Sequence, residues 1–173
     1  MSHKINKVAI FGGTHGNELT GVFQVKKYQQ SPDLIQPESF KTVAFLANPE
    51  AIKKVLRYID TDLNRCFKSE DLLNQNLINY EQQLAKKIAE QMKEENIDFI
   101  IDIHSTTSNM GLTIILHNEN PYLLRLAAYL SAINPLVKVL KYPLNPNPPY
   151  LRAITEMGLG IEVGAIAQGV LNA

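Results

Sequence analysis

Short apolar runs alternate along this chain with longer segments of mixed polarity. Each apolar run has the length and composition of a buried β-strand, and most are followed by glycine, proline or asparagine residues that end them. The pattern predicts six strands, over Lys7–Phe11, Thr42–Leu46, Phe99–Ile103, Thr113–Leu116, Val137–Leu140 and Leu159–Val163.

The segments between these runs carry the spacing of amphipathic helices. The clearest is Asn79–Glu95, in which Leu84, Ile88 and Met92 fall on one face and Glu and Lys on the other. Further helices are expected over Glu18–Gln30, from Asn48 to near Arg57, over Pro121–Ile133 and over Leu151–Met157, with an irregular Pro-rich loop over Tyr142–Pro149. Strands alternating with helices predict one α/β domain over residues 1–173, with a mostly parallel mixed sheet and helices on both faces.

Composition and charge exclude several classes of protein. The 173 residues include 17 Lys and Arg against 17 Asp and Glu, so the chain lacks the basic excess of a nucleic-acid binder or a polybasic membrane anchor. Its single cysteine, Cys66, cannot form an internal disulfide. The apolar run Val8–Phe11 is too short for a signal peptide or a membrane helix. We therefore expect a cytoplasmic protein with no membrane or nucleic-acid partner.

Two histidines follow predicted strands, at the edge where open α/β sheets bind ligands. His15 comes after the first strand, three residues before Glu18, and His104 comes directly after Phe99–Ile103. Two imidazoles and a carboxylate leave one position of a tetrahedral zinc ion open, as in a catalytic site. A His-x-x-Glu pair alone is weak evidence, since most such pairs are solvated. The nearby glycines could form a phosphate-binding loop, but the Lys-Ser/Thr of a nucleotide P-loop is missing.

The arginines and one glutamate extend this hypothesis. Arg57 and Arg65 bracket a polar stretch without helical or strand periodicity, and a guanidinium can bind a carboxylate through two hydrogen bonds. The structural alternative is that Arg65 pairs with Asp60 or Asp62. Glu162 interrupts an apolar strand, where an unpaired carboxylate is costly. It either faces solvent from an edge strand or faces the site, where burial would raise its pKa toward that of a general base.

Four blocks of sequence stand out in chain order, Gly12–Gly21, Arg57–Arg65, Asp102–Gly111 and Gly160–Gly164. Together they resemble the aspartoacylase and succinylglutamate desuccinylase family of the zinc carboxypeptidase superfamily. The resemblance implies a zinc carboxypeptidase-like fold and an enzyme that hydrolyses the amide of an N-acyl amino acid. The match is closer to the aspartoacylases, which implies N-acetyl-L-aspartate as substrate, with acetate and L-aspartate as products.

Carried over by position, the resemblance assigns roles to nine residues. It implies one zinc ion per subunit held by His15, Glu18 and His104, and a general base, Glu162, that activates the catalytic water. It also implies that Arg57 polarises the scissile carbonyl, and that substrate carboxylates are bound by Asn64, Arg65 and Arg152, with Tyr150 as an offset candidate because Pro148 occupies the matching position.

Four further residues have no assigned role in the resemblance. Asp102, two residues before His104, could orient the ligand imidazole or bond only to backbone. His3 and His117 are expected at the surface, and Cys66 is expected to be a packed side chain rather than a nucleophile.

The family's members are longer than this chain and continue into a C-terminal β-rich domain that helps to wall the substrate channel. We therefore expect a catalytic domain that is incomplete at its C-terminus and that could form a homo-oligomer. Three alternatives stay open: a deacylase for N-acetylated aromatic residues or N-succinylglutamate, a metal-binding remnant without catalysis, and a nucleotide-binding module using the glycine loop.

Overall fold

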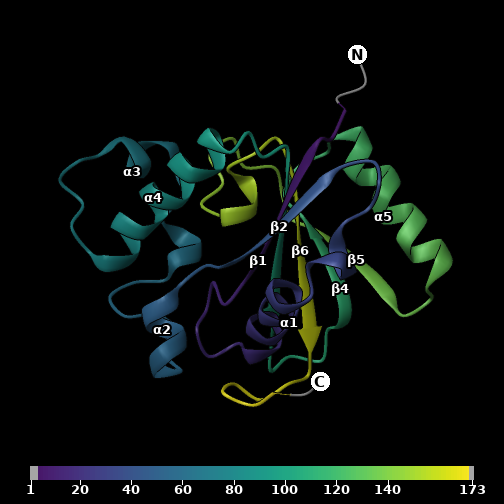
Figure 1. Ribbon diagram of the computed structural model, residues 1–173, viewed down its shortest axis with the longest axis horizontal. Coiled ribbons are helices and arrows are strands. Elements are labelled where there is room, and N and C mark those ends of the chain that lie inside the picture. Colours follow the sequence, from purple (N-terminus) through teal and green to yellow (C-terminus); the bar gives the residue numbers. More distant parts are fainter. Residues whose placement is uncertain (1–3, 172–173) are drawn as a thin grey trace.

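The computed structural model describes residues 4–171 as a six-stranded sheet with helices packed on both faces (Figure 1). The strands are β1 (Lys7–Gly12), β2 (Lys41–Leu46), β3 (Phe99–Ser105), β4 (Gly111–Leu116), β5 (Val137–Lys141) and β6 (Met157–Gly164). The α-helices are α1 (Leu19–Gln30), α2 (Pro49–Lys54), α3 (Ser69–Leu73), α4 (Tyr80–Glu94) and α5 (Pro121–Ile133), and the 3-10 helices are η1 (Pro32–Ile35), η2 (Leu63–Arg65) and η3 (Leu151–Ala153).

The strand order is β2-β1-β3-β6-β4-β5, and every neighbouring pair is parallel except β4 with β6. The expected α/β class with a mostly parallel mixed sheet is therefore confirmed. Since β1, β3 and β6 run parallel as neighbours, their carboxyl ends meet at one edge of the sheet. Side chains near those ends come from distant parts of the sequence and lie close together.

Alternating residues of the strands supply two separate cores. In β1, Ala9 and Phe11 pack with the inner face of α4, whereas Val8 and Ile10 pack with α1 and α5 on the opposite side. This is the period-two alternation of a strand buried on both faces. Figure 1 shows the same arrangement, with α4 on one side of the sheet and α1 and α5 on the other.

The boundaries of some helices differ from those expected. The helix that begins after Asn48 ends at Lys54 rather than near Arg57, because Val55 takes a left-handed conformation with φ 53°. The expected helix over Leu151–Met157 is wrong beyond its first turn, since Met157 already belongs to β6. The short helices η1, η2 and α3 were not expected, because segments of three to five residues carry no readable periodicity.

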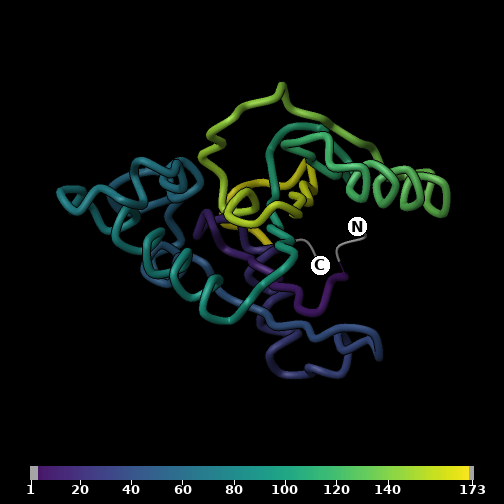
Figure 2. Tube along the Cα trace, turned by 90° about the horizontal axis from the view of Figure 1, so that it is seen from above, coloured from purple at the N-terminus to yellow at the C-terminus, as the bar shows by residue number. Residues whose placement is uncertain are grey.

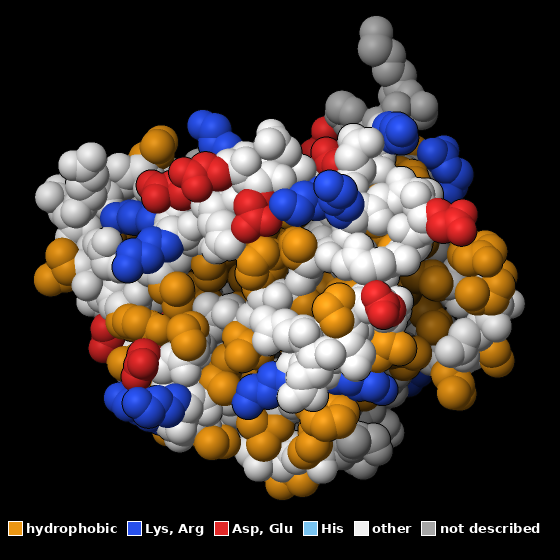
Figure 3. Space-filling model, in the orientation of Figure 1, with side chains coloured by type: hydrophobic (Ala, Val, Ile, Leu, Met, Phe, Trp, Pro, Cys, Tyr) orange, Lys and Arg blue, Asp and Glu red, His pale blue; other side chains and the backbone are white. Residues whose placement is uncertain are grey.

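The Pro-rich segment between β5 and η3 is irregular, as expected, and arches outside the sheet in the view of Figure 2, where it is coloured yellow-green. On the face shown in Figure 3, Lys and Arg side chains lie among Asp and Glu side chains without forming a patch of one sign, in keeping with the zero net charge. Among the described residues, no helix has both the length and the apolar composition needed to cross a membrane.

Candidate metal centre

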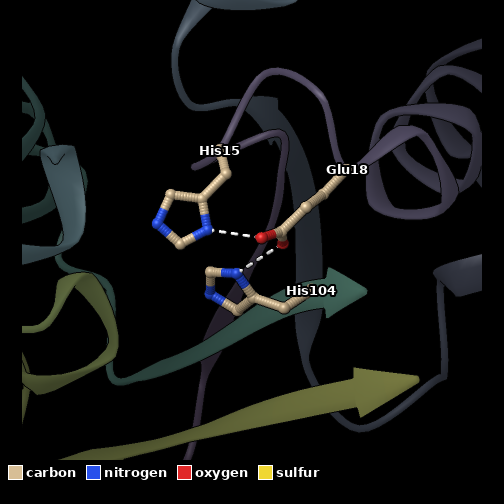
Figure 4. Close-up of side chains that lie close together, drawn as sticks. All are labelled: His15, Glu18 and His104. Atoms are coloured by element: carbon tan, nitrogen blue, oxygen red, sulfur yellow. Dashed lines mark hydrogen bonds and ion pairs between the residues drawn. The ribbon is translucent and has the colours of Figure 1, made fainter. Parts of the chain in front are cut away.

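Three buried side chains converge at the edge of the sheet where β1 and β3 end. His15 lies in the loop after β1, Glu18 precedes α1 as its N-cap residue, and His104 is the penultimate residue of β3. Figure 4 shows both imidazoles turned toward the Glu18 carboxylate. The Nδ1 atoms of His15 and His104 lie 2.6 and 2.9 Å from its two oxygens.

The chemistry of these donors fits a zinc ion. Their ligand atoms lie within 4.8 Å of one another, so a single ion can contact all three side chains. Two nitrogens and one carboxylate leave one position of a tetrahedral zinc open, which is the composition of a catalytic rather than a structural site. Cys66 is not one of the converging ligands: it is buried beside η2, where its Sγ contacts the backbone oxygen of Asp62.

Each imidazole has a second carboxylate behind it. His104 Nε2 lies 2.7 Å from Asp102 Oδ2, and His15 Nε2 lies 2.9 Å from Asp62 Oδ1. Asp102 also accepts a hydrogen bond from the Thr14 hydroxyl, at 2.7 Å, so it meets side chains rather than backbone. Such outer partners fix the orientation and tautomer of metal-binding histidines. The contacts of Asp102 fit the first of its two expected roles, that of orienting a ligand imidazole. The equivalent contact of Asp62 with His15 was not predicted from the sequence.

The ionisable groups in this cluster shift one another's pKa values. Burial alone would raise the pKa of Glu18, but its hydrogen bonds with His104 and His15 lower the pKa to about 2. Burial alone would lower the pKa of both histidines, yet Asp102 and Glu18 raise that of His104 well above its usual range, and Asp62 and Glu18 raise that of His15. A metal ion bound here would displace these protons, since imidazoles bind metals in the neutral form.

Glu162 faces this cluster from the neighbouring strand. It pairs in register with His104 across the parallel β3–β6 ladder and with Thr113 on the other side, so β6 is an interior strand. The alternative that Glu162 faces solvent from an edge strand is therefore wrong. Its partly buried side chain lines a cavity of about 450 Å³ that also contains His15, Glu18 and His104. Burial raises the pKa of Glu162, with a smaller contribution from the Glu18 carboxylate.

Arg57 reaches the centre from the loop before η2. Its Nη1 lies 3.4 Å from Glu18 Oε1 and its Nη2 donates to Asp62 Oδ2 at 3.1 Å, while 43% of the side chain stays exposed. The expected alternative pairing of Arg65 with Asp60 or Asp62 is wrong. Arg65 instead donates to the backbone oxygen of Asn64 and lines the same cavity.

Arg152 is a buried residue of the same cavity. It is only 3% exposed and its guanidinium stacks over the rings of Tyr150 and Tyr142, with Cζ 4.3 and 5.6 Å from their centroids. Its Nε and Nη2 are buried without a hydrogen-bond partner among the described residues. Buried donors of this kind are suited to an anionic ligand.

Gly158 in β6 leaves room for the backbone of this arginine, whereas Gly160 only borders its side chain at an ordinary contact distance. A Cβ on Gly158 would stand 2.0 Å from the Arg152 backbone oxygen, and one on Gly160 would stand 3.5 Å from its Cδ. Asn64 ties the same region to the metal cluster: its Oδ1 accepts from the Leu151 backbone N–H at 3.0 Å, and its Nδ2 lies 3.5 Å from His104 Nε2.

Two tyrosines and a third histidine complete the surroundings. Tyr150, the offset candidate, lines the cavity, and so does Tyr142, which sequence reasoning missed because nothing in a Pro-rich loop marks one residue for a distant site. His117 was expected at the surface but is 5% exposed. Burial lowers its pKa to about 4, assisted by the positive charge of Arg152. His3 lies outside the described residues. Cys66 is packed as expected, and burial raises the pKa of its thiol to about 12.

Fold and site together define an α/β domain of the zinc carboxypeptidase-like fold with a His-Glu-His centre at the carboxyl edge of its sheet. Residues 4–173 match the sequence model of the succinylglutamate desuccinylase/aspartoacylase catalytic domain. The chain belongs to this family.

Similar proteins bear several names. A probable aspartoacylase from Nostoc sp. (strain PCC 7120) is 56% identical over 99% of this chain. An N-acyl-aromatic-L-amino acid amidohydrolase (carboxylate-forming) from Xenopus laevis is 36% identical over 99%. The crystal structure of murine aminoacylase 3 superimposes with a TM-score of 0.92 and 31% identity over the whole chain and 60% of the murine one. The chain spans 59% of the length of these two curated relatives.

Proposed function

We propose that residues 1–173 form the catalytic domain of a zinc-dependent amidohydrolase that deacylates N-acyl amino acids, with N-acetyl-L-aspartate as its substrate. One observation carries the proposal: a three-residue metal centre, a partly buried carboxylate and three arginines line a single cavity. The family and the 56% identity to a probable aspartoacylase support it.

In this proposal His15, Glu18 and His104 hold one zinc ion per subunit. When bound, zinc polarises a carbonyl oxygen and makes a water molecule acidic enough to lose a proton near neutral pH. The remaining work falls to the protein's own side chains. Asp62 and Asp102 would hold the two imidazoles with Nδ1 directed toward the ion, because each carboxylate occupies the opposite ring nitrogen.

Glu162 is proposed as the general base and then the general acid. Its carboxylate would take a proton from the attacking water as the new carbon–oxygen bond forms, and would return that proton to the amide nitrogen as the carbon–nitrogen bond breaks. The raised pKa brings Glu162 closer to the value that favours both transfers at neutral pH. General acid–base catalysis of this kind contributes about 10²–10⁴-fold to a rate.

The arginines are proposed to share the negative charges of substrate and transition state. Arg57, beside Glu18 and still partly exposed, would donate to the scissile carbonyl oxygen as charge develops on it. Asn64, Arg65 and Arg152 would bind substrate carboxylates. The unpartnered Nε and Nη2 of Arg152 offer two parallel donors, and Tyr150 would hold that guanidinium in place.

A second candidate is the deacylation of N-acyl aromatic amino acids, which the Xenopus laevis relative's name and the two cavity tyrosines favour. The two candidates differ in the demand for a side-chain carboxylate. If Arg152 donates hydrogen bonds to the side-chain carboxylate of the substrate, N-acetyl-L-aspartate is expected to be hydrolysed faster than N-acetyl-L-tyrosine. Arg152→Met is then expected to remove most of that preference. An equal or reversed preference in the unmodified chain would reject the aspartate assignment.

The basic activity test is acetate release from N-acetyl-L-aspartate by the zinc-loaded chain, with Glu162→Gln and metal-free protein as controls. Zinc-dependent release that falls about 10³-fold in Glu162→Gln supports the proposal. Release that survives this substitution rejects Glu162 as the base. Zinc binding without release would identify a metal-binding domain that does not catalyse alone. The cytoplasmic location and the homo-oligomer expected from the sequence stay predictions.

A further inference from the structure

Glu81 is a buried carboxylate that lies outside the candidate centre. It is the second residue of α4 and is fully buried, which is costly for an ionised group unless its oxygens are well hydrogen-bonded. Four donors satisfy it: the backbone N–H groups of Ile59, Asp60 and Thr61, at 2.6, 3.0 and 3.1 Å, and the Asn48 amide at 3.1 Å.

The three backbone donors are consecutive, so the Glu81 carboxylate binds three successive N–H groups of the loop between α2 and η2. Successive N–H groups of this kind form an anion-binding concavity. The contact is reciprocal, because Asp60 Oδ2 accepts the backbone N–H of Tyr80 at 2.8 Å, next to Glu81. Together these contacts bind a loop with almost no regular structure to the start of α4.

This loop carries two side chains into the metal centre. Arg57 lies before the three amides and contacts Glu18, while Asp62 follows them directly and contacts His15. The backbone links the same segments, since the Gly16 N–H donates to the Arg57 oxygen at 3.2 Å. A shift of the loop would therefore reach both His15 and Glu18.

A second route from Glu81 leads to the same place. Asn48, which donates to Glu81, is fully buried, and its backbone N–H donates to the oxygen of Gly13, at 3.2 Å, two residues before His15. The His104 side of the centre is tied to this loop less directly, because its outer partner Asp102 lies on β3 itself. Asp102 accepts from Thr14, and Asn64, whose backbone N–H donates to Asp62, lies 3.5 Å from the His104 ring.

We propose that Glu81 is a positioning residue of the metal centre, one that sets Asp62 against His15 and Arg57 against Glu18 by holding the 59–61 amides. The functional consequence of this assignment rests on the proposed function, but the contacts do not. A merely structural Glu81 would stabilise α4 and its loop without a selective effect on His15.

The first test uses the metal-free chain and needs no turnover. Ring ¹⁵N signals of the histidines are recorded by NMR for Glu81→Gln, Asp62→Asn and Glu90→Gln, the last being an exposed control on the same helix. Glu81→Gln is expected to shift the His15 ring signals as Asp62→Asn does and to shift those of His104 less. His15 signals that stay unchanged, or that move no more than those of His104, overturn the proposal.

The second test is a double-mutant cycle on zinc affinity. Each of Glu81→Gln and Asp62→Asn is expected to weaken zinc binding about tenfold, and the double variant is expected to lose little more than either alone, because both act through one contact. Losses that multiply to about a hundredfold would show that Glu81 does not act through Asp62 and would overturn the proposal. If the losses of zinc affinity multiply but the unmodified chain still hydrolyses N-acetyl-L-aspartate, the proposal for Glu81 fails while the proposed function stands.

Amide exchange covers the case in which Glu81→Gln does not fold. In the unmodified chain the amides of Ile59, Asp60 and Thr61 are expected to be protected although they lie in a loop. Glu81→Asp has a side chain that is one methylene shorter, so its carboxylate lies further from the 59–61 amides. It is expected to reduce their protection and to shift the His15 ring signals less than Glu81→Gln does. Unprotected 59–61 amides in the unmodified chain, or weakened protection in Glu81→Asp without a His15 response, would reject the proposal.

Discussion

The two imidazoles of the metal centre are built in different ways. His104 and its outer carboxylate, Asp102, stand two residues apart on one strand, so the period of β3 places both on the same face. His15 lies in a loop, and its outer carboxylate, Asp62, comes from another loop 47 residues later, with 18% of its side chain exposed. One half of the centre depends on sheet geometry and the other on contacts between loops. We expect the strand-built half to be the more sensitive to loss of its carboxylate.

A third histidine gives the sharpest contrast, because it is buried without a carboxylate. His117 is 5% exposed and its pKa falls from 6.5 to about 4, whereas carboxylates raise the pKa of His15 and His104. Between pH 6.5 and 4 the unfolded chain therefore binds a proton at His117 that the folded chain does not. This group should lower the free energy of unfolding by about 3 kcal/mol as the pH falls through that range, with no further change above or below it.

Urea denaturation of the unmodified chain and of His117→Gln at a series of pH values measures this contribution. Other groups titrate in the same range, so the difference between the two proteins isolates His117. The variant should lose less stability than the unmodified chain as the pH falls. Parallel curves would mean that His117 takes up its proton equally well in the folded chain.

The next largest effect is expected on the strand-built half. Asp102→Asn removes the negative charge behind His104 at a fully buried position, where no water can replace it. Zinc affinity should fall about a hundredfold, at the upper end of the range for outer partners of metal ligands. Isothermal titration with zinc at pH 7 measures it, with the exposed Asp33→Asn as control. A loss of zinc affinity smaller than that in Asp62→Asn would mean that the loop-built half, not the strand-built half, is the more sensitive to loss of its carboxylate.

Asp62→Asn should have the smaller effect, about tenfold on zinc affinity, because this carboxylate is partly exposed and water can take part of its place. Arg57 also loses its partner at 3.1 Å, so the rate of N-acetyl-L-aspartate hydrolysis should fall more than zinc affinity does. The hydrolysis rate is measured on zinc-saturated protein and the zinc affinity by isothermal titration of the metal-free protein. The ratio of the two losses shows whether Asp62 positions Arg57 as well as His15. Equal losses of rate and of zinc affinity would mean that Asp62 positions His15 but not Arg57.

Strand-borne and loop-borne residues of the site differ in how far the sequence could predict them. The strands, the longer helices and the convergence of His15, Glu18 and His104 follow from apolar periodicity and from the rule that parallel strands end at one edge. For Glu162 the strand pattern left two orientations open, and only the family resemblance predicted that it faces the site. Asp102 could be found because it shares a strand with His104. Asp62, Tyr142 and Glu81 could not, because each acts through the course of an irregular loop, and no period in the sequence encodes where such a loop lies.

X-ray absorption at the zinc edge of the loaded chain tests most directly whether His15, Glu18 and His104 form a zinc site. We predict one zinc per chain with only nitrogen and oxygen neighbours at about 2.0–2.2 Å, including two imidazoles, and loss of this signal in His104→Ala. A sulfur neighbour at about 2.3 Å, which only Cys66 or a methionine could supply, or an unchanged spectrum in His104→Ala, would contradict it.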